Sequence, residues 1–345
     1  MDKKRLIYGF LLVLIVVLMG SLIAGVVISN EIARSSKDEY LWASKEKAKA
    51  HIMVIIDDSN QAYDEAFNKG ILDTAAEFNI AVEINKIDRS NYYEDVIVAL
   101  DKAKYLKVNG IIVHAIDDEG IIEKIKEISD IGIPVITIEE DVPKSPRICY
   151  VGVNRYDIGQ LAGESFARLL NGKGKIAVID QRSYGKDRTF QEEMMMLGLK
   201  EVLKSYPNLT LEIIKYTEQG VLSAETVATE ILLNNNQVNG ILCTSGENTL
   251  GVVQVLIDNN LVNDVVLVGY GNDTEIMEYI KKGNVIEASI VTDYEDIGRE
   301  AIKAFVEYRT NKFVSSYINT DIRVVDETNI LDYISEMSDS NDQNE

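Results

Sequence analysis

The chain has 345 residues, of which 46% are hydrophobic and 7% aromatic, a composition that favours a packed core divided between two domains over disorder. Its 35 Lys and Arg against 56 Asp and Glu give a formal net charge of −21. This argues against a nucleic-acid partner, because phosphate binding needs a concentrated basic surface. Cys149 and Cys243 lie in or beside apolar runs and are expected to be buried, inert thiols.

The N-terminus carries the clearest local signal. Lys3, Lys4 and Arg5 precede an uncharged run over residues 6–29, which is long enough to span ~30 Å of hydrocarbon. A cleaved signal peptide has a shorter apolar core and a small-residue cleavage site, and the site here is poor, so an uncleaved anchor is favoured. We expect residues 1–30 to be a cytoplasmic stub and transmembrane helix and residues 31–49 a juxtamembrane linker. The chain would then be a single-pass protein of the cell membrane with the remainder outside the cytoplasm.

From His51 onward, short β-branched runs alternate with amphipathic stretches, a pattern that indicates α/β architecture with parallel sheets covered on both faces. Strands are expected at 52–56, 81–84, 110–113, 134–138, 175–179, 211–214, 240–243, 265–268 and 286–290. Helices are expected at 65–78, 93–105, 120–131, 158–170, 192–205, 224–233, 249–259 and 297–308.

The alternation breaks after residue 138, where a loop with Pro143 and Pro146 leads into an extended segment at 148–153 before the series resumes. We interpret this segment as a crossover between two doubly wound sheets. Such sheets bind ligands at the carboxyl ends of their strands, which predicts a cleft there. The last residues are rich in Ser, Asp, Asn and Glu, so 333–345 is expected to be a disordered acidic tail.

Four stretches, at 109–113, 132–138, 150–164 and 268–271, together resemble the sugar-type periplasmic binding proteins. These are the ribose and galactose branch, which shares its fold with the ligand domains of lactose-repressor-like regulators. The resemblance covers about 51–329 and implies a type I fold, two parallel-sheet lobes joined by a three-segment hinge. The N-terminal lobe would comprise 50–152 plus 293–320, and the C-terminal lobe 153–292 plus 321–332.

At the ligand positions implied by the resemblance, the chain departs from ribose binders. Asn60 and Tyr63 match, whereas Glu139 and Glu140 stand where the family often has Asp-Arg, and Met195 replaces a family Arg. The predicted ligand-binding residues are Asp58, Asn60, Tyr63, Asp64, His114, Asp117, Glu139, Glu140, Arg155, Arg188, Ser245, Asn248, Asn272, Asp273, Thr292 and Asp293.

Several of these residues have competing interpretations. Asp57, Asp58 and Asn60 form an acidic cluster, for which ligand contact is favoured over metal binding because no second oxygen-ligand cluster accompanies it. In the stretch 150–164, Asn154 is a plausible N-cap and Gly163 permits close helix-to-sheet packing, which leaves Arg155 a weaker ligand candidate. His114 is either a site residue or a satisfied interior histidine.

The charge balance of the site also stays open. Asp58, Glu139 and Glu140, together with Met195 in place of Arg, predict a pocket more acidic than a ribose site, suited to an amino sugar or a neutral polyol. Alternatively, Arg182, Arg188 or Arg155 enters from a neighbouring loop and restores the ordinary balance.

The resemblance implies an extracytoplasmic solute-binding protein that captures a sugar-like ligand for the permease of an ABC importer. The alternative is a membrane-anchored sensor that signals to a histidine kinase when the lobes close, as some anchored xylose-sensing relatives do. No catalytic fingerprint is present and only two histidines occur, so no enzyme activity, cofactor or metal is expected. DNA binding is excluded by the net charge and by the apolar run at the position of a DNA-binding domain.

Overall fold

The computed structural model describes residues 48–57, 61–87, 91–181, 190–218, 220–234, 237–283 and 285–342. The expected anchor at 1–30 lies outside these residues, as does the expected linker apart from its last two positions. Within the described ranges, no helix combines the length and apolarity needed to cross a membrane. Residues Ala50–Glu345 form one compact unit.

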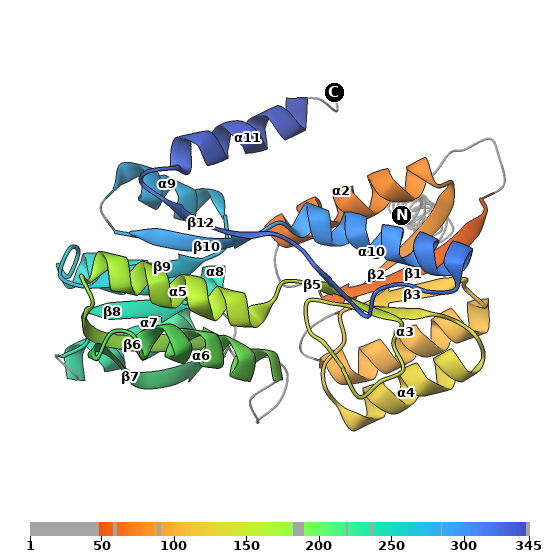
Figure 1. The fold of residues 1–345 in the computed structure, drawn as a ribbon, viewed down its shortest axis with the longest axis horizontal. Helices are drawn as coiled ribbons and strands as arrows, with labels where there is room; N and C mark the ends of the chain where they lie inside the picture. Colours follow the sequence, from red (N-terminus) through yellow and green to blue (C-terminus); the bar gives the residue numbers. More distant parts are fainter. Residues whose placement is uncertain are drawn as a thin grey trace, which may run out of the picture. The chain divides into compact units, whose positions relative to one another are not determined.

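The first half of this unit is a parallel sheet with strand order β11-β5-β4-β3-β1-β2 (Figure 1). Its strands are β1 Ala50–Asp57, β2 Ile80–Ile87, β3 Gly110–Val113, β4 Val135–Ile138, β5 Cys149–Gly152 and β11 Tyr317–Asn319. Four helices cover it, α2 Gln61–Glu77, α3 Tyr92–Leu106, α4 Glu119–Asp130 and α10 Tyr294–Asn311. We call this half the first lobe.

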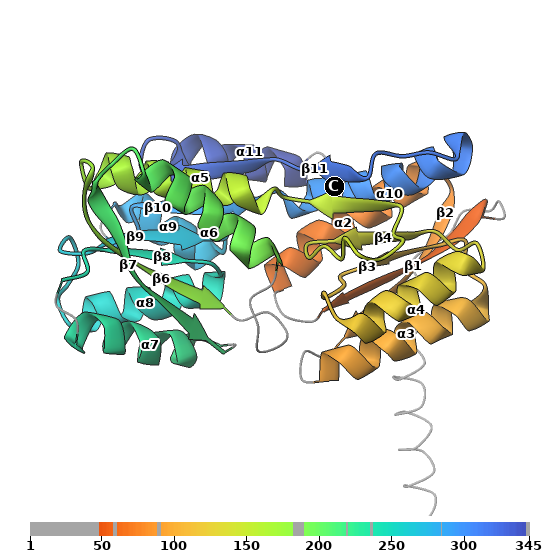
Figure 2. The same cartoon turned by 60° about the horizontal axis from the view of Figure 1, so that its bottom comes forward.

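Both faces of the first sheet are buried, and the alternation of side chains along β1 shows why. Ile52 and Val54 pack with α2 and α10, whereas Met53 and Ile55 pack with α3 and α4 on the opposite face. Figures 1 and 2 show the helix pairs on the two sides of the sheet. Such double burial explains why the strands are continuous apolar runs.

The second lobe repeats this plan, with strand order β12-β10-β9-β8-β6-β7, and only β12 runs antiparallel to its neighbour among the described strands. Its strands are β6 Lys173–Gln181, β7 Asn208–Thr217, β8 Gly240–Cys243, β9 Val266–Tyr270, β10 Ala288–Thr292 and β12 Ile322–Asp326. Its helices are α5 Arg155–Leu169, α6 Phe190–Leu203, α7 Val221–Asn234, α8 Gly246–Asp258, α9 Thr274–Lys282 and α11 Ile330–Asp342.

Close backbone contact fixes α5 against α6. A Cβ atom at Gly159 would lie 2.0 Å from the carbonyl oxygen of Met195, and one at Gly198 would lie 2.0 Å from that of Tyr156. Only glycine allows this approach. Gly163 likewise meets the side chain of Val202 on α6, so it serves helix-to-helix packing and not the helix-to-sheet packing expected from the sequence.

The chain passes between the sheets at three places, after Gly152, after Thr292 and after Asn319. The three segments hydrogen-bond to one another. The backbone N–H of Thr320 donates to the carbonyl of Gly152 at 3.0 Å, and that of Asp293 donates to the carbonyl of Asp321 at 3.4 Å. The crossovers therefore form one narrow, connected bridge.

The expected helices and strands are all found, with ends shifted by a few residues, but α9, β11 and β12 were not expected. The expectation of a disordered tail at 333–345 was wrong for residues 333–342, which belong to α11. Ile330 and Tyr333 are buried against the second lobe, and Ile334 packs beside them. These apolar residues at helical spacing anchor the helix despite its polar composition.

A buried ion pair ties the loop after β4 to the last crossover strand. The Arg147 Nε and Nη2 atoms both donate to the carboxylate of Asp141, and Nη1 donates to the carbonyl of Ser316 at 2.9 Å. The guanidinium carbon also lies 4.7 Å from the ring centre of Tyr317 on β11. This arrangement holds β11 at the edge of the first sheet.

We expect Asp141→Ala to lower the free energy of unfolding by about 3–5 kcal/mol, because it leaves a buried guanidinium without its partner. The two side chains are only 6% and 0% exposed. The control is Asp130→Ala, which breaks the exposed Lys126–Asp130 pair and should cost less than about 0.5 kcal/mol. Urea unfolding of the purified variants measures both, and equal costs would show that the buried pair has no special role.

Candidate functional site

The carboxyl ends of the parallel strands carry most of the polar side chains singled out in the sequence. In the first lobe Asp57 ends β1, His114 follows β3 and Glu139 follows β4. In the second lobe Ser245 lies two residues beyond the end of β8, and Asn272 lies two residues beyond the end of β9. Because the crossovers after β5, β10 and β11 also leave from carboxyl ends, the polar edges of both sheets lie next to the bridge between the lobes.

Glu139 and Arg155 bring the two lobes' polar edges together. Arg155 opens α5 directly after the first crossover, and its Nη2 atom lies 3.8 Å from Oε2 of Glu139. This separation is an ion-pair distance but too long for a hydrogen bond. Oε1 of Glu139 and Nε of Arg155 are both buried and have no hydrogen-bond partner among the described residues. Buried charged groups with unused hydrogen-bonding capacity are uncommon and point to a ligand.

Burial raises the pKa of Glu139, and Asp57 adds to this rise while Arg155 opposes it. Burial alone would lower the pKa of Arg155, but Tyr270, Glu139 and Glu140 outweigh it and the net pKa is raised. The guanidinium is therefore charged throughout the physiological range. Of the two interpretations left open by the sequence, Arg155 does stand beside the carboxylates, while Met195 is buried in the core between α5 and α6. Arg182 and Arg188 lie outside the described residues.

The backbone at Glu139 is held in an unusual conformation. Its φ is +61°, in the left-handed region that a residue with a side chain rarely adopts. The hydroxyl of Tyr150 lies 3.0 Å from the carbonyl oxygen of Glu139 and 3.3 Å from that of Val153, so its single proton is shared between the site and the first crossover. The strain at Glu139 is thus held by a fully buried tyrosine.

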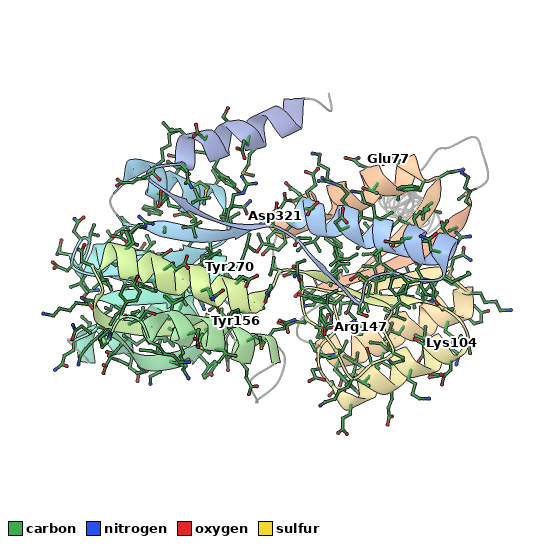
Figure 3. All side chains as sticks on the ribbon, viewed as in Figure 1. Glu77, Lys104, Arg147, Tyr156, Tyr270 and Asp321 are labelled. Carbon is green, nitrogen blue, oxygen red and sulfur yellow. The ribbon has the colours of Figure 1, made fainter. Side chains whose placement is uncertain are left out.

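Two further tyrosines lie near Arg155. Tyr270 ends β9, and its hydroxyl is 2.8 Å from Oγ1 of Thr292 at the second crossover. Tyr294 begins α10 on the other side of that crossover, and its pKa is raised well above the ordinary value by burial, then by Tyr270 and Glu139. Tyr270 is labelled in Figure 3, together with Asp321 on the last crossover. The site therefore contains aromatic hydroxyls as well as charges.

His114 lies beside Asp57 in the first lobe. Its Nδ1 atom is 3.7 Å from a carboxylate oxygen of Asp57, and its ring meets the ring of Tyr92 edge-on at 5.9 Å. The Tyr92 hydroxyl donates to the carbonyl of His114. Both His114 and Asp57 are buried, so His114 is an interior histidine at the polar edge of the sheet, and its role as a ligand-binding residue stays a prediction.

Other predicted residues already have hydrogen bonds within the second lobe. Ser245 caps α8 by accepting from the N–H of Asn248 at 3.2 Å. The buried Asn248 side chain accepts from Thr217 at 2.8 Å and donates to the carbonyl of Ile179 at 3.2 Å. Asn272 donates to the Tyr333 hydroxyl on α11 at 3.1 Å. These contacts give each side chain a structural role.

Asp273 stands out because it occupies the N-cap position of α9 without accepting a capping hydrogen bond from its side chain. One of its carboxylate oxygens instead lies near Gly246 and Gly271, 3.2 Å from where a Cβ atom of Gly271 would be. The Asp273 carboxylate therefore lies beside the turn after β9, where the positive φ of Gly271 (+98°) favours glycine.

The remaining predicted residues are less informative. Glu140 is buried next to Glu139, Thr292 contacts Tyr270, and Asp117 and Asp293 are exposed, with Asp293 capping α10 through the N–H of Asp296 at 2.9 Å. Tyr63 and Asp64 lie in the first turn of α2. Asp58, Asn60 and Arg188 lie outside the described residues.

Sequence reasoning missed Tyr150, Tyr270 and Tyr294 as members of the site, and it also missed Asp180. Asp180 ends an apolar strand and accepts a hydrogen bond from Thr244 at 2.8 Å. The three tyrosines lie in apolar strands or at a helix start, where an aromatic residue is typical of the core. The available signal was the polar hydroxyl of a tyrosine close to the carboxyl end of a strand, where the site was expected.

Residues 52–312 match the family model described as a periplasmic binding protein domain, so the chain belongs to that family. The resemblance to sugar-type periplasmic binding proteins of the type I fold is thereby confirmed. A comparison with curated proteins gave no match.

Several solved structures share the fold. The glucose-galactose binding protein GanP from Geobacillus stearothermophilus is 26% identical with a TM-score of 0.73, covering 81% of this chain and 98% of its own. A solute-binding protein from Actinobacillus succinogenes 130z with bound D-allose is 22% identical with a TM-score of 0.73, covering 83% and 100%. The XylFII-LytSN complex gives 24% identity and a TM-score of 0.72, covering 82% and 99%.

The raised pKa of Glu139 predicts how Glu139→Gln affects stability in the absence of any sugar. As pH rises past the ordinary value of 4.5, the unfolded chain loses this proton first, so the ionised carboxylate lowers the free energy of unfolding. The glutamine variant should therefore become more stable relative to the natural chain as the pH rises above 4.5 toward the raised pKa of the folded chain. Denaturant unfolding across this range measures the difference, with Asp117→Asn as the control for losing an exposed carboxylate. A stability difference that falls with pH would contradict the assignment.

Proposed function

We propose that the chain captures a sugar or sugar-like polar ligand outside the cytoplasm and delivers it to an ABC importer. The observation that carries the proposal is the Glu139–Arg155 pair, one member from each lobe, with a buried acceptor and a buried donor that no described residue satisfies. Carboxylates and guanidinium groups form strong, charge-assisted hydrogen bonds, which suits them to bind sugar hydroxyls. The structural relatives include a glucose-galactose binding protein and solute-binding proteins in complex with D-allose and with D-arabinose.

The connected bridge of crossovers supports closure of the lobes on the ligand as the mechanism. Hinge motions use a few residues at element ends, and the three crossing segments provide them at 153, 293 and 320–321. Ligand contacts with both Glu139 and Arg155 would stabilise the closed form. In this proposal the chain releases the sugar unchanged, so a sugar recovered after prolonged incubation should show no chemical alteration.

We expect Glu139→Gln to bind sugar roughly 10- to 100-fold more weakly, since a lost charge-assisted hydrogen bond costs about 1.5–3 kcal/mol. A thermal-shift screen of the natural chain against neutral aldoses identifies the sugar, and calorimetry measures affinities. The matched control is Arg168→Gln on the same helix as Arg155, where the side chain is 54% exposed and pairs with Asp326. Undiminished affinity in Glu139→Gln, or the absence of any sugar response in the natural chain, would refute the site.

A second candidate function is sensing. The XylFII-LytSN complex among the structural relatives supports it, and so does the expected membrane anchor, because confinement to a membrane raises the effective concentration of a membrane partner. The membrane anchor is part of this proposal. If it is present, the full-length chain should remain in membranes that are washed at alkaline pH.

Deleting the gene separates the two functions. An importer component predicts that uptake of the labelled sugar at low concentration is lost. A sensor predicts that uptake by other routes continues while transcription induced by the sugar is lost. Measuring both in the same strain, with the gene restored as the control, decides between them.

A further inference from the structure

The first lobe has a second edge, at the end of its sheet opposite the candidate site. All its parallel strands begin there, and the chain enters the compact unit at this edge, at Ala50. Backbone hydrogen bonds join the entering segments. The N–H of Asn109 donates to the carbonyl of His51 at 2.7 Å, and that of Tyr150 donates to the carbonyl of Ser316 at 3.0 Å. We call this end of the lobe the amino edge.

Large apolar side chains lie exposed along the amino edge, where the helices of the lobe end. Tyr105 is 86% exposed and Phe313 is 70% exposed, and Phe78, Leu106 and Ile131 are exposed as well. Phe78 and Phe313 follow the helices on one face of the sheet, and the other three lie at the ends of the helices on the opposite face. Exposed apolar residues are ordinary when scattered, but these five gather at one end of the lobe.

The charge of the amino edge differs from that of the rest of the chain. The segments that enter β1, β2, β3, β4 and β11 contain three lysines, Lys49, Lys107 and Lys312, and no carboxylate, although the whole chain has a net charge of −21. Lys107 and Lys312 form no ion pair with any residue that the structure describes. In sequence, the nearest carboxylates are Glu77 and Asp130 in the last turns of α2 and α4, and Asp130 is engaged in an exposed ion pair. The amino edge therefore combines exposed aromatic rings with unpaired cations.

We infer that the amino edge of the first lobe rests on the surface of a lipid bilayer that contains anionic lipids. Aromatic side chains favour the membrane–water interface, and lysines are attracted to anionic headgroups. The inference goes beyond sugar capture and rests on the anchor expected at residues 1–30, from which the chain reaches this edge at Ala50. The corresponding edge of the second lobe is unlike it, because the segment that enters β9 carries the exposed carboxylate of Asp264.

Contact at the amino edge sets the orientation of the binding site. Strand β1 runs from Ala50 at this edge to Asp57 beside the site, and its eight extended residues span roughly 25 Å. The site is then held at about this height above the headgroups, with the carboxyl ends of the first sheet directed away from the bilayer. Figure 3 labels Glu77 and Lys104, which lie in the last turns of α2 and α3 next to the surface in question.

The test uses the full-length chain in vesicles of phosphatidylcholine with phosphatidylglycerol and a nitroxide-headgroup lipid. Cys149 and Cys243 are buried, so an impermeant maleimide dye labels an introduced thiol. Ala76→Cys places the dye on the exposed last turn of α2, and Asn91→Cys places it before α3 at the opposite end of the lobe. The dye at Ala76→Cys should be quenched by the nitroxide lipid, whereas the dye at Asn91→Cys should not.

Substitutions at the amino edge should release the lobe while the anchor keeps the chain in the vesicles. Tyr105→Ser with Phe313→Ser should lower the ratio of docked to undocked lobe roughly 10-fold for each aromatic lost. Lys107→Gln with Lys312→Gln should lower it roughly 5-fold for each lysine in anionic vesicles, and leave it unchanged in pure phosphatidylcholine. Leu222→Ser, at an exposed position of the second lobe, is the control that should keep the quenching. Thermal unfolding verifies that each variant is folded.

The outcomes separate the inference from its supports. A chain that alkaline washing removes from the vesicles would overturn both the anchor and the docking. Retention of the chain with equal quenching at the two labelled positions, or with none, would overturn the docking alone. Energy transfer between labelled copies in place of lipid quenching would also overturn it, because the apolar side chains would then join two copies. Calorimetry with sugar on the same vesicles tests the proposed function separately.

Discussion

Burial of charge is the constraint on which the candidate site depends. A carboxylate removed from water is tolerated only beside a compensating cation or hydrogen-bond donors, and Glu139 has the guanidinium of Arg155 at 3.8 Å. The two residues come from different lobes. The first crossover must therefore position the start of α5 so that Arg155 lies beside Glu139. Tyr150 fixes the crossover's start, and the glycine contacts between α5 and α6 fix the helix that follows.

The second and third crossovers are also held by contacts close to the buried charges of the site. Thr292 lies where β10 leaves the second lobe, and it meets the hydroxyl of Tyr270 near Arg155. The last crossover is held at its first-lobe end by Arg147, through Ser316 and Tyr317. Movement of one lobe relative to the other would therefore act on residues adjacent to the charged pair. A ligand bound at this pair is well placed to favour one arrangement of the lobes.

The sequence predicted the βα series well because parallel strands buried on both faces are apolar throughout, as β1 and β8 show. It failed at α9, a helix of nine residues, and at β11, whose three residues are half exposed. Both are short, but α9 is amphipathic, with Ile276, Met277 and Ile280 buried on one face, so its helical pattern was present in the sequence and was overlooked. In α11, the composition indicated disorder, but Ile330, Tyr333 and Ile334 form an apolar stripe at spacings of three and four that the second lobe buries.

The site was predictable by position but not by pairing. The family resemblance pointed to Glu139 and Asp273, which follow strand ends, while the spacing between residues 139 and 155 contains no signal that the two side chains meet. That contact depends on a three-dimensional crossover between sheets. Local rules also failed in an instructive way: Asp273 stands at a helix start and does not cap it, and Glu139 adopts a positive φ. Residues that forgo a favourable local interaction are expected where function competes with stability.

Glu139 shows this competition most directly. Its left-handed backbone costs about 1–2 kcal/mol, and burial of its carboxylate raises the pKa, so the ionised residue lowers the stability of the folded chain. Arg155 offsets part of this cost by charge but leaves Oε1 of Glu139 without a hydrogen bond from any described residue. A closer ion pair would satisfy both side chains and leave nothing for a ligand to bind. At the 3.8 Å separation an acceptor and a donor keep hydrogen-bonding capacity that no described residue uses, and in the proposed function a sugar hydroxyl would take it up.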